Sequence, residues 1–274
     1  MSGVCLQRLA VCCRCSCQPP PHNPCGATVF RQSGCTPLRV SVFRNMEYFW
    51  RGRTQNNREL VESLKQNGSL RTKRVADVME QVDRGLFVPP NELPYIDNPM
   101  PIGYNATISA PHMHAACLEL LSGHLQPGMC ALDVGAGTGY LTAAFGMMVG
   151  KGGRAVGIEH IPELTHQAIE NVQRSRAGPL LASGSLSLHT GDGREGYPAG
   201  APYDAIHVGA AASEVPQALV DQLKPGGRMV IPVGDIFQEL TVIDKAPDGS
   251  LKQWGATSVR YVPLTSRQSQ LGHN

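Results

Sequence analysis

The chain has 274 residues, of which 42% are hydrophobic and 17% charged, and a formal net charge of +2. No apolar run approaches the length that crosses a bilayer, so we expect a soluble protein with one large domain and no membrane partner. Residues 1–45 carry five arginines and no acid, which leaves residues 46–274 at −3. A mildly acidic domain argues against a broad nucleic-acid-binding surface.

Residues 1–45 form a tail rich in Cys, Pro and Arg without hydrophobic periodicity, and we expect it to be disordered. Its cysteines are crowded rather than paired as two separate CxxC units, which disfavours zinc. An acid-free, Arg-bearing leader also fits a transit peptide, but folded-looking sequence begins at Met46 and favours an alternative start there. Cys117 and Cys130 favour a reducing compartment. We therefore expect a cytosolic domain over 46–274, with mitochondrial targeting by the tail as the alternative.

Apolar residues at helical spacing predict two amphipathic helices ahead of the main fold, one stopping at Gly68 and the next running to Pro89. After a Pro-rich crossing, a third helix begins at Pro111. From residue 130 to Gly234 strand-like and helix-like segments alternate, which predicts a parallel sheet with helices on both faces. Beyond Gly234, two β-rich runs around a Pro-Asp-Gly turn predict an added antiparallel hairpin.

The stretch LDVGAGTGYL closes a strand and opens a helix, where glycines let a ligand approach the backbone and its free amides. Gly135, Gly137 and Gly139 have the spacing G-x-G-x-G, not the G-x-G-x-x-G of a dinucleotide site, which disfavours a nicotinamide cofactor. Glu159 ends the next strand, where an acid accepts hydrogen bonds from both hydroxyls of a ribose. Asp192 ends the third strand. Together these strand ends predict a nucleoside ligand without a pyrophosphate.

The stretch NATISAPHMHAAC sets Ser109, His112, His114 and Cys117 within nine positions, which is the raw material of a hydrolase or a metal site. Zinc would need further ligands, and nearby acids are scarce. Cys117 lies on an apolar helix face, which favours a buried structural thiol over a nucleophile. The sequence assigns no role to His112.

The motifs LDVGAGTG, GIEH and GDG with a terminal β-hairpin resemble the class I S-adenosylmethionine-dependent methyltransferases. Over about residues 53–265, ATISAPHMHA, DAIHVGAAA, VPQALVDQLKPGGRMVIPVG and YVPLT resemble the protein-L-isoaspartate (D-aspartate) O-methyltransferases. This resemblance implies a Rossmann-like α/β fold: a mostly parallel seven-stranded sheet with a C-terminal antiparallel hairpin and N-terminal helices. It also implies repair of damaged proteins and peptides by methyl transfer from S-adenosylmethionine to the free carboxylate of L-isoaspartyl and, less efficiently, D-aspartyl residues. The methyl ester then collapses to a succinimide.

The resemblance also implies the site residues. It places the functional serine at Ser109, a cofactor-lining histidine at His114 and a residue that closes over the cofactor at Thr265. The expected cofactor-binding positions are Ala106, Thr107, Ile108, Ser109, His114, Asp133, Gly135, Gly137, Gly139, Glu159, Asp192, Gly193 and Thr265, with no metal. Because a carboxylate with a pKa of about 4 is already ionised at neutral pH, we expect Ser109 to orient the substrate rather than to act in a triad.

Two other functions compete with this interpretation. A cofactor-binding adaptor without turnover is expected to carry a long C-terminal extension, whereas only nine residues follow Thr265. A methyltransferase acting on RNA would need a basic domain or an added RNA-binding module. We therefore expect a monomeric enzyme whose partners are isoaspartyl proteins and peptides.

Overall fold

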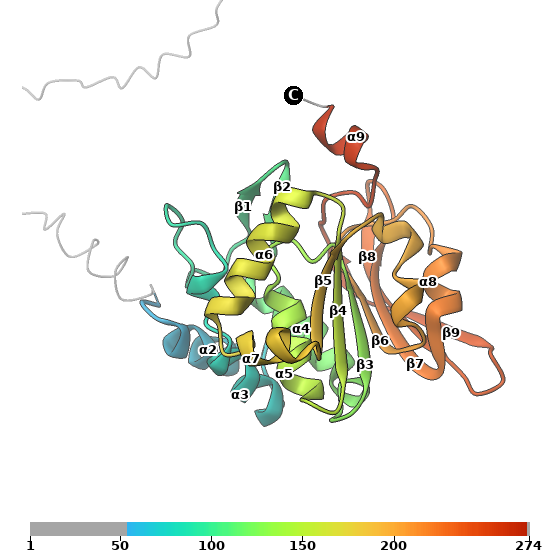
Figure 1. Ribbon diagram of the computed structural model, residues 1–274, viewed down its shortest axis with the longest axis horizontal. Coiled ribbons are helices and arrows are strands. Elements are labelled where there is room, and N and C mark those ends of the chain that lie inside the picture. Colours follow the sequence, from blue (N-terminus) through green and yellow to red (C-terminus); the bar gives the residue numbers. More distant parts are fainter. Residues whose placement is uncertain (1–53, 273–274) are drawn as a thin grey trace, which may run out of the picture. The chain divides into compact units, whose positions relative to one another are not determined.

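The computed structural model describes residues 54–272 (Figure 1). The predicted tail, its seven cysteines and the domain boundary at residue 46 lie outside the described residues. Within residues 54–272, no helix combines the length and apolar character that a membrane crossing requires.

The first two helices are α2 (Asn57–Gln66) and α3 (Lys73–Gln81). The Asn56 side chain caps α2 by accepting a hydrogen bond from the amide of Glu59. The prediction that the second helix runs to Pro89 is wrong, because α3 ends at Gln81. The Asp83 side chain accepts from the Gly85 amide and starts the short 3-10 helix η1 (Arg84–Leu86), which turns Arg84 into the interior.

The Pro-rich crossing contains a small antiparallel hairpin that the sequence did not predict, formed by β1 (Met100–Gly103) and β2 (Ala106–Ile108). Its turn residues Tyr104 and Asn105 have φ values of +53° and +57°, the left-handed region that a two-residue hairpin turn requires. The predicted third helix is confirmed as α4 (Pro111–Leu121), followed by the 3-10 helix η2 (Ser122–His124).

The remaining strands form one sheet, and the remaining helices connect or follow them. The predicted alternation of strands and helices and the predicted terminal hairpin are confirmed. The strands are β3 (Cys130–Val134), β4 (Arg154–Glu159), β5 (Leu186–Thr190), β6 (Tyr203–Val208), β7 (Leu223–Val233), β8 (Gln238–Lys245) and β9 (Leu251–Val259). The helices are α5 (Tyr140–Val149), α6 (Pro162–Arg174), α7 (Gly178–Ser183), η3 (Gly193–Glu195), η4 (Pro198–Gly200), α8 (Gln217–Gln222) and α9 (Arg267–Leu271). The strand order is β5-β4-β3-β6-β7-β8-β9. The first five strands in this order are parallel to one another, β8 is antiparallel to β7, and β9 is antiparallel to β8.

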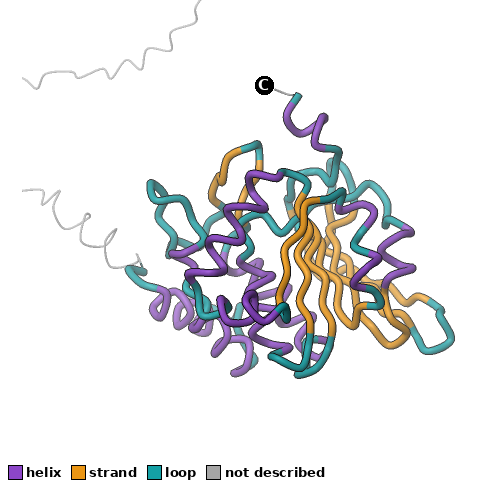
Figure 2. Tube along the Cα trace, in the orientation of Figure 1, coloured by secondary structure: helices purple, strands orange, loops and turns teal. Residues whose placement is uncertain are grey.

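Two hydrophobic cores lie on the two faces of this sheet, with helices flanking the strands (Figure 2). Successive side chains of a strand point to opposite faces. Accordingly Ala131 packs in the core that contains α2 to α6, whereas Leu132 and Val134 pack in the core that contains Leu219 of α8. The parallel strands β3, β4 and β6 are therefore buried on both sides, as their continuous apolar runs require, whereas β9 is largely exposed.

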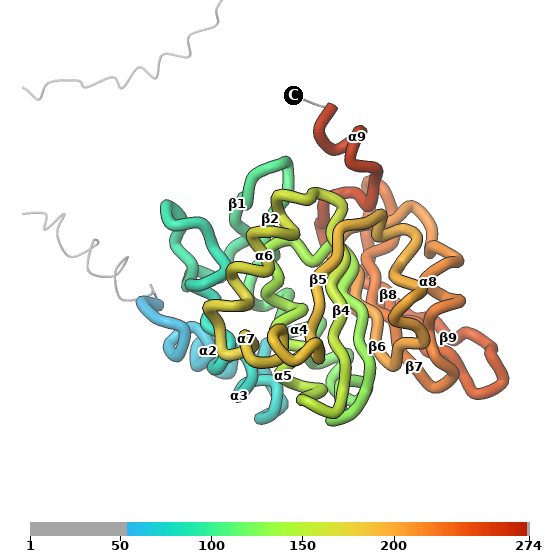
Figure 3. Tube along the Cα trace, in the orientation of Figure 1, coloured from blue at the N-terminus to red at the C-terminus, as the bar shows by residue number. Residues whose placement is uncertain are grey.

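The direction of winding reverses at β3, because the chain first adds β4 and β5 on one side and then β6 on the other. Ligands of open α/β sheets bind at the carboxyl ends of the strands at such a switch point. The β1–β2 hairpin and α9 come together at this edge, far apart in sequence and in the colours of Figure 3. The Asn105 side chain donates to the Gln270 carbonyl at 2.9 Å, and the Gln270 side chain donates to the Tyr104 carbonyl at 2.8 Å.

Candidate active site

The glycine-rich turn joins β3 to α5 at the switch point. Gly135, Gly137 and Gly139 have φ values of +75°, +52° and +84°, which non-glycine residues rarely adopt. Gly139 caps α5, and a Cβ at this position would lie 3.2 Å from side-chain atoms of Ala168 and Val172 in α6. The first two glycines line a pocket, whereas the third permits close packing of two helices.

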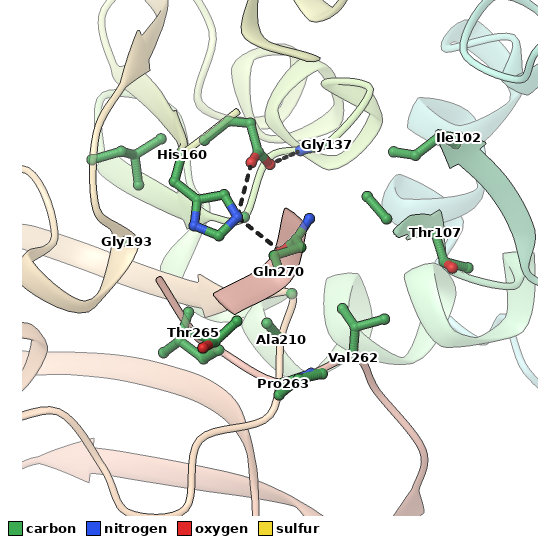
Figure 4. A pocket seen from close by; sticks show the side chains of 16 residues that line it. Ile102, Thr107, Gly137, His160, Gly193, Ala210, Val262, Pro263, Thr265 and Gln270 are labelled. Carbon is green, nitrogen blue, oxygen red and sulfur yellow. Dashed lines mark hydrogen bonds and ion pairs between the residues drawn. The ribbon is translucent and has the colours of Figure 1, made fainter. Parts of the chain in front are cut away.

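This pocket, called the main pocket below, is bounded by the glycine turn, the end of β4, the β1–β2 hairpin and the C-terminal segment (Figure 4). Its lining residues are Ile102, Ala106, Thr107, Gly135, Gly137, Ile158, Glu159, His160, Gly193, Gly209, Ala210, Val262, Pro263, Leu264, Thr265 and Gln270.

Glu159 is the buried acid of the main pocket, with 6% of its surface exposed. One carboxylate oxygen accepts from the Gly137 amide at 3.0 Å and the other from the Ile161 amide at 3.1 Å. Because each carboxylate oxygen offers two lone pairs, both can accept one further donor. This donor set fits the two hydroxyls of a ribose.

Gln270 and His160 reach the main pocket from segments 110 residues apart. The His160 Nε2 atom lies 2.9 Å from Oε1 of Gln270 and 3.9 Å from the Glu159 carboxylate (Figure 4). Neither residue was among the predicted site positions. The position of His160 directly after Glu159 was a usable signal, whereas Gln270 lies in a segment without a distinctive pattern.

A second cavity, the inner pocket, continues from the main pocket below the glycine turn. Its lining residues are Thr107, Ile108, Ser109, His114, Asp133, Gly135, Ala136, Gly137, Thr138, Tyr140, Leu141, His207 and Gly209. Four of these, Thr107, Gly135, Gly137 and Gly209, also line the main pocket, so the two cavities adjoin.

Asp133 lies at the floor of the inner pocket with both carboxylate oxygens engaged. One accepts from the Thr142 hydroxyl at 2.6 Å, and the other lies 2.8 Å from Nδ1 of His207. Burial lowers the pKa of His207, but the neighbouring Cys117 and Asp133 outweigh burial and raise it to about 10. The His207 Nε2 atom is buried and has no hydrogen-bond partner within residues 54–272.

His114 lines the inner pocket beside Arg84. Its Nδ1 atom lies 3.2 Å from Nη1 of Arg84, and its ring stacks on Tyr140 with centroids 4.7 Å apart. Burial, followed by the charge of Arg84, holds the pKa of His114 well below its usual range. The ring is therefore neutral at physiological pH.

A third cavity of about 630 Å³, the outer groove, opens beside the inner pocket. Its lining residues are Pro99, Thr107, Ser109, Ala110, His112, Met113, Gly209, Ser258, Val259, Arg260, Tyr261 and Val262. Ser109 lines both the inner pocket and the outer groove, so its side chain lies where ligands of the two cavities would meet. Burial raises the pKa of Tyr261, which also interacts with Cys117 and Ser109.

Most of the predicted site positions meet at this edge of the sheet. The main or inner pocket is lined by Ala106, Thr107, Ile108, Ser109, His114, Asp133, Gly135, Gly137, Glu159, Gly193 and Thr265. Gly139 and Asp192 line neither pocket. The Asp192 carboxylate instead pairs with Arg194 at 2.5 Å, a bond that lowers the pKa of Asp192.

The remaining residues of the serine–histidine stretch do not form a metal or nucleophile site. His112 pairs with Asp97 at 2.8 Å, and Cys117 is fully buried. No group of three or more His, Cys, Asp or Glu side chains within the described range is arranged to hold a metal ion.

A doubly wound sheet with a glycine turn at its switch point and a ribose-compatible acid on the next strand defines a Rossmann-like, nucleoside-binding protein. Residues 55–269 match the family protein-L-isoaspartate(D-aspartate) O-methyltransferase (PCMT), and this chain belongs to that family.

Curated relatives and solved structures agree with this assignment. The chain is 66% identical over 227 residues to the protein-L-isoaspartate O-methyltransferase of Triticum aestivum, covering 82% of this chain and 99% of that protein. It is 60% identical to protein-L-isoaspartate O-methyltransferase 1 of Arabidopsis thaliana, with the same coverage. A crystal structure of the beta-aspartate methyltransferase (PCMT) of Plasmodium falciparum, in complex with S-adenosyl-L-homocysteine, matches with a TM-score of 0.72 and 35% identity, covering 77% of this chain and 99% of that one.

Proposed function

We propose that this chain is a protein-repair enzyme that transfers a methyl group from S-adenosylmethionine to the free carboxylate of L-isoaspartyl residues and, less efficiently, D-aspartyl residues. The observation that carries this proposal is the place of Ser109 between the inner pocket and the outer groove. Family membership and the complex of the Plasmodium falciparum relative support it.

The main and inner pockets fit the parts of S-adenosylmethionine. Glu159 would accept from the ribose hydroxyls, and Gly135 and Gly137 leave room for close approach of the ligand to the backbone. Thr265 would close over the nucleoside, and His114 would face the methionyl part. When bound, this cofactor supplies a methyl group that its sulfonium makes electrophilic.

The outer groove would hold the damaged polypeptide with its carboxylate at Ser109. An unperturbed carboxylate has a pKa of about 4 and is ionised at neutral pH, so it needs no general base. The two described acids of the pockets agree with this, because Asp133 is paired with His207 and Glu159 accepts backbone amides.

Ser109 is suited to positioning. The reaction joins an anion to a cation, so charge is lost on the way to the transition state, and a strong cationic clamp on the carboxylate would stabilise the ground state more. A neutral hydroxyl orients the carboxylate without that penalty. The rate enhancement then comes from alignment and from exclusion of water.

The test is methyl transfer from labelled S-adenosylmethionine to a synthetic isoaspartyl peptide beside its normal-aspartyl twin. We expect base-labile methylation of the isoaspartyl peptide alone. Replacing Ser109 by Ala removes one hydrogen bond from a hydroxyl to the ionised carboxylate, worth about 1.5 kcal/mol, so we expect kcat to fall at least about ten-fold. Ser122→Ala, outside the three cavities, is the matched control.

Two results would contradict the proposal in different ways. Tight binding of S-adenosyl-L-homocysteine without methylation of either peptide would contradict the proposed enzymatic activity and favour a cofactor-binding adaptor. Methylation of the isoaspartyl peptide with an unchanged kcat in Ser109→Ala would keep the activity but remove the role of Ser109.

We further propose that the chain acts on polypeptides rather than nucleic acid, as a monomer in the cytosol. Cys117 and Cys130 are free thiols, which supports a reducing compartment. Light scattering would test the oligomeric state, and fluorescent fusions of the full chain and of residues 46–274 would separate cytosolic from mitochondrial location.

A further inference from the structure

Arg84 is a fully buried arginine beneath the candidate active site. None of the described carboxylates lies within ion-pair distance of its guanidinium, and its Nε atom is buried without a hydrogen-bond partner in the same residues. Burial lowers the pKa of Arg84 to about 10, so the group is still a cation at neutral pH. Burying an ion without a counter-ion is energetically costly. A residue retained at that cost needs an explanation beyond packing.

The guanidinium contacts two residues that line the inner pocket. Nη1 lies 3.2 Å from Nδ1 of His114, and Nη2 donates to the backbone carbonyl of Ser109 at 2.9 Å. The guanidinium also lies 5.9 Å from the centre of the Tyr140 ring, on which His114 stacks. The backbone amide of Arg84 donates to the Asn57 side chain at 3.2 Å. One side chain, anchored by α2 and η1, thus reaches both Ser109 and His114.

The contact with His114 fixes the position of a proton. An arginine side chain only donates hydrogen bonds, so Nδ1 of His114 must be the acceptor. A neutral imidazole carries its proton on the other nitrogen, Nε2. His114 therefore offers one N–H donor, and its ring lines the inner pocket.

We propose that Arg84 is a positioning residue of the methyl-transfer site: it fixes His114 as the Nε2-protonated tautomer and holds the backbone of Ser109 in place. This inference rests on the function proposed above. Because Arg84 lines none of the three cavities, it acts through the other two residues rather than on a ligand.

Arg84 and the other titratable groups around His114 add a pH-dependent prediction. Arg84 from η1, His207 from β6 and His112 from α4 all disfavour a charged His114, and burial disfavours it most. Tyr140 from α5 stacks on the ring, and burial raises the pKa of this phenol to about 12, so it stays neutral. Removing the Arg84 charge should therefore raise the pKa of His114, whereas replacing arginine by lysine keeps the charge and should not.

Three variants separate a positioning role from a structural one. Arg84→Met removes the charge and both hydrogen bonds, and Arg84→Lys keeps the charge but loses the two-armed contact. Arg154→Met is the matched control, because Arg154 also donates to a backbone carbonyl, that of Gly200 at 2.6 Å, and also has a buried Nε without a partner. Arg154 begins β4, at the opposite edge of the sheet.

The readouts are the ¹⁵N imidazole signals of His114 and the kinetics with the isoaspartyl peptide. In the unmodified protein we expect the Nε2-protonated tautomer and no titration of His114 between about pH 5.5 and 8. In Arg84→Met we expect a mixed tautomer, a His114 pKa higher than in the unmodified protein, and a kcat about 100-fold lower, as for a misplaced reactive group. Arg84→Lys should lower kcat about ten-fold without the rise in the His114 pKa, and Arg154→Met should leave kcat unchanged.

A folded Arg84→Met variant that keeps the Nε2-protonated tautomer and an unchanged kcat would overturn the inference. If Arg84→Met does not fold, Arg84→Lys decides the question: a kcat about ten-fold lower supports the inference, and an unchanged kcat with an unchanged His114 tautomer overturns it. Failure of the proposed function is distinguishable, because the unmodified protein would then methylate neither peptide while the His114 signals still report on Arg84.

Discussion

Replacing Glu159 by Gln tests the assignment of the main pocket as the nucleoside site. The glutamate accepts from the Gly137 and Ile161 amides at 3.0 and 3.1 Å and, in our proposal, from two ribose hydroxyls. In glutamine one carboxylate oxygen becomes an amide nitrogen, which cannot accept. Hydrogen bonds to charged groups contribute about 1.5–3 kcal/mol each. The variant loses one hydrogen bond to the ribose, and the other hydrogen bond then runs to a neutral oxygen instead of a charged one. Together these changes should cost about 3 kcal/mol of binding free energy, or about 100-fold in Kd.

Calorimetric titration with S-adenosyl-L-homocysteine measures this loss directly. Glu170→Gln makes the same chemical change on an exposed residue of α6 outside the three cavities, and we expect its Kd to stay within about two-fold of the unmodified protein. A Kd for Glu159→Gln within about three-fold of the unmodified value would refute the ribose assignment. If Tm fell while Kd stayed constant, Glu159 would serve only to anchor the glycine turn.

Three further outcomes follow from the geometry. Gly139→Ala should destabilise the protein by about 1 kcal/mol more than Gly184→Ala in urea unfolding, because both glycines have φ near +80° but only at Gly139 would the added Cβ press on neighbouring side chains, at 3.2 Å. Equal losses would contradict the packing argument. The folded-state pKa of His207 is raised from 6.5 to about 10, so its stabilising contribution is complete below pH 6.5 and disappears as pH rises through 10. Between pH 6.5 and 10 the unfolding free energy of the unmodified protein should thus fall more steeply than that of His207→Gln. If both proteins show the same dependence of unfolding free energy on pH, His207 makes no such contribution. Gln270→Ala removes its bonds to His160 and the hairpin and should raise the Kd for S-adenosyl-L-homocysteine about ten-fold, whereas an unchanged Kd would show that α9 does not close the pocket.

The sequence predicted the sheet because its strands are short apolar runs separated by helices, and burial on both faces leaves that pattern in a single sequence. The failures are places where one side chain overrides the pattern. Val82 and Phe87 continue an apolar rhythm, so the second helix was expected to run on, but Asp83 caps a 3-10 turn and ends it. The hairpin turn at Tyr104 and Asn105 contains no glycine, so the usual signal of a two-residue turn was missing.

The residues of the candidate site likewise divide into those that the sequence pattern predicts and those that it does not. Gly135, Gly137 and Glu159 were predictable because each marks the end of a strand, and strand ends of a parallel sheet meet at one edge. Arg84 was not, since its contact with His114 depends on tertiary packing across 30 residues. Gln270 was a candidate match to the family pattern, but the divergent sequence after Thr265 kept it out of the predicted positions, and its contact with the hairpin spans 166 residues. The prediction for Asp192 stays a prediction: its carboxylate pairs with Arg194, two residues later, and only the neighbouring Gly193 lines the main pocket.

The serine, histidine and cysteine of one short stretch resemble a hydrolase triad, and their contacts explain why they do not form one. A general base needs a free lone pair close to the hydroxyl it activates. His114 has none, because Nδ1 accepts from Arg84 and the neutral ring then carries its proton on Nε2. Cys117 is fully buried and unable to meet a polypeptide in the outer groove. A serine whose neighbouring histidine, His114, offers no free lone pair suits a nucleophile that arrives already ionised, and a carboxylate is such a nucleophile. The arrangement around Ser109 therefore favours alkylation of a substrate anion over hydrolysis.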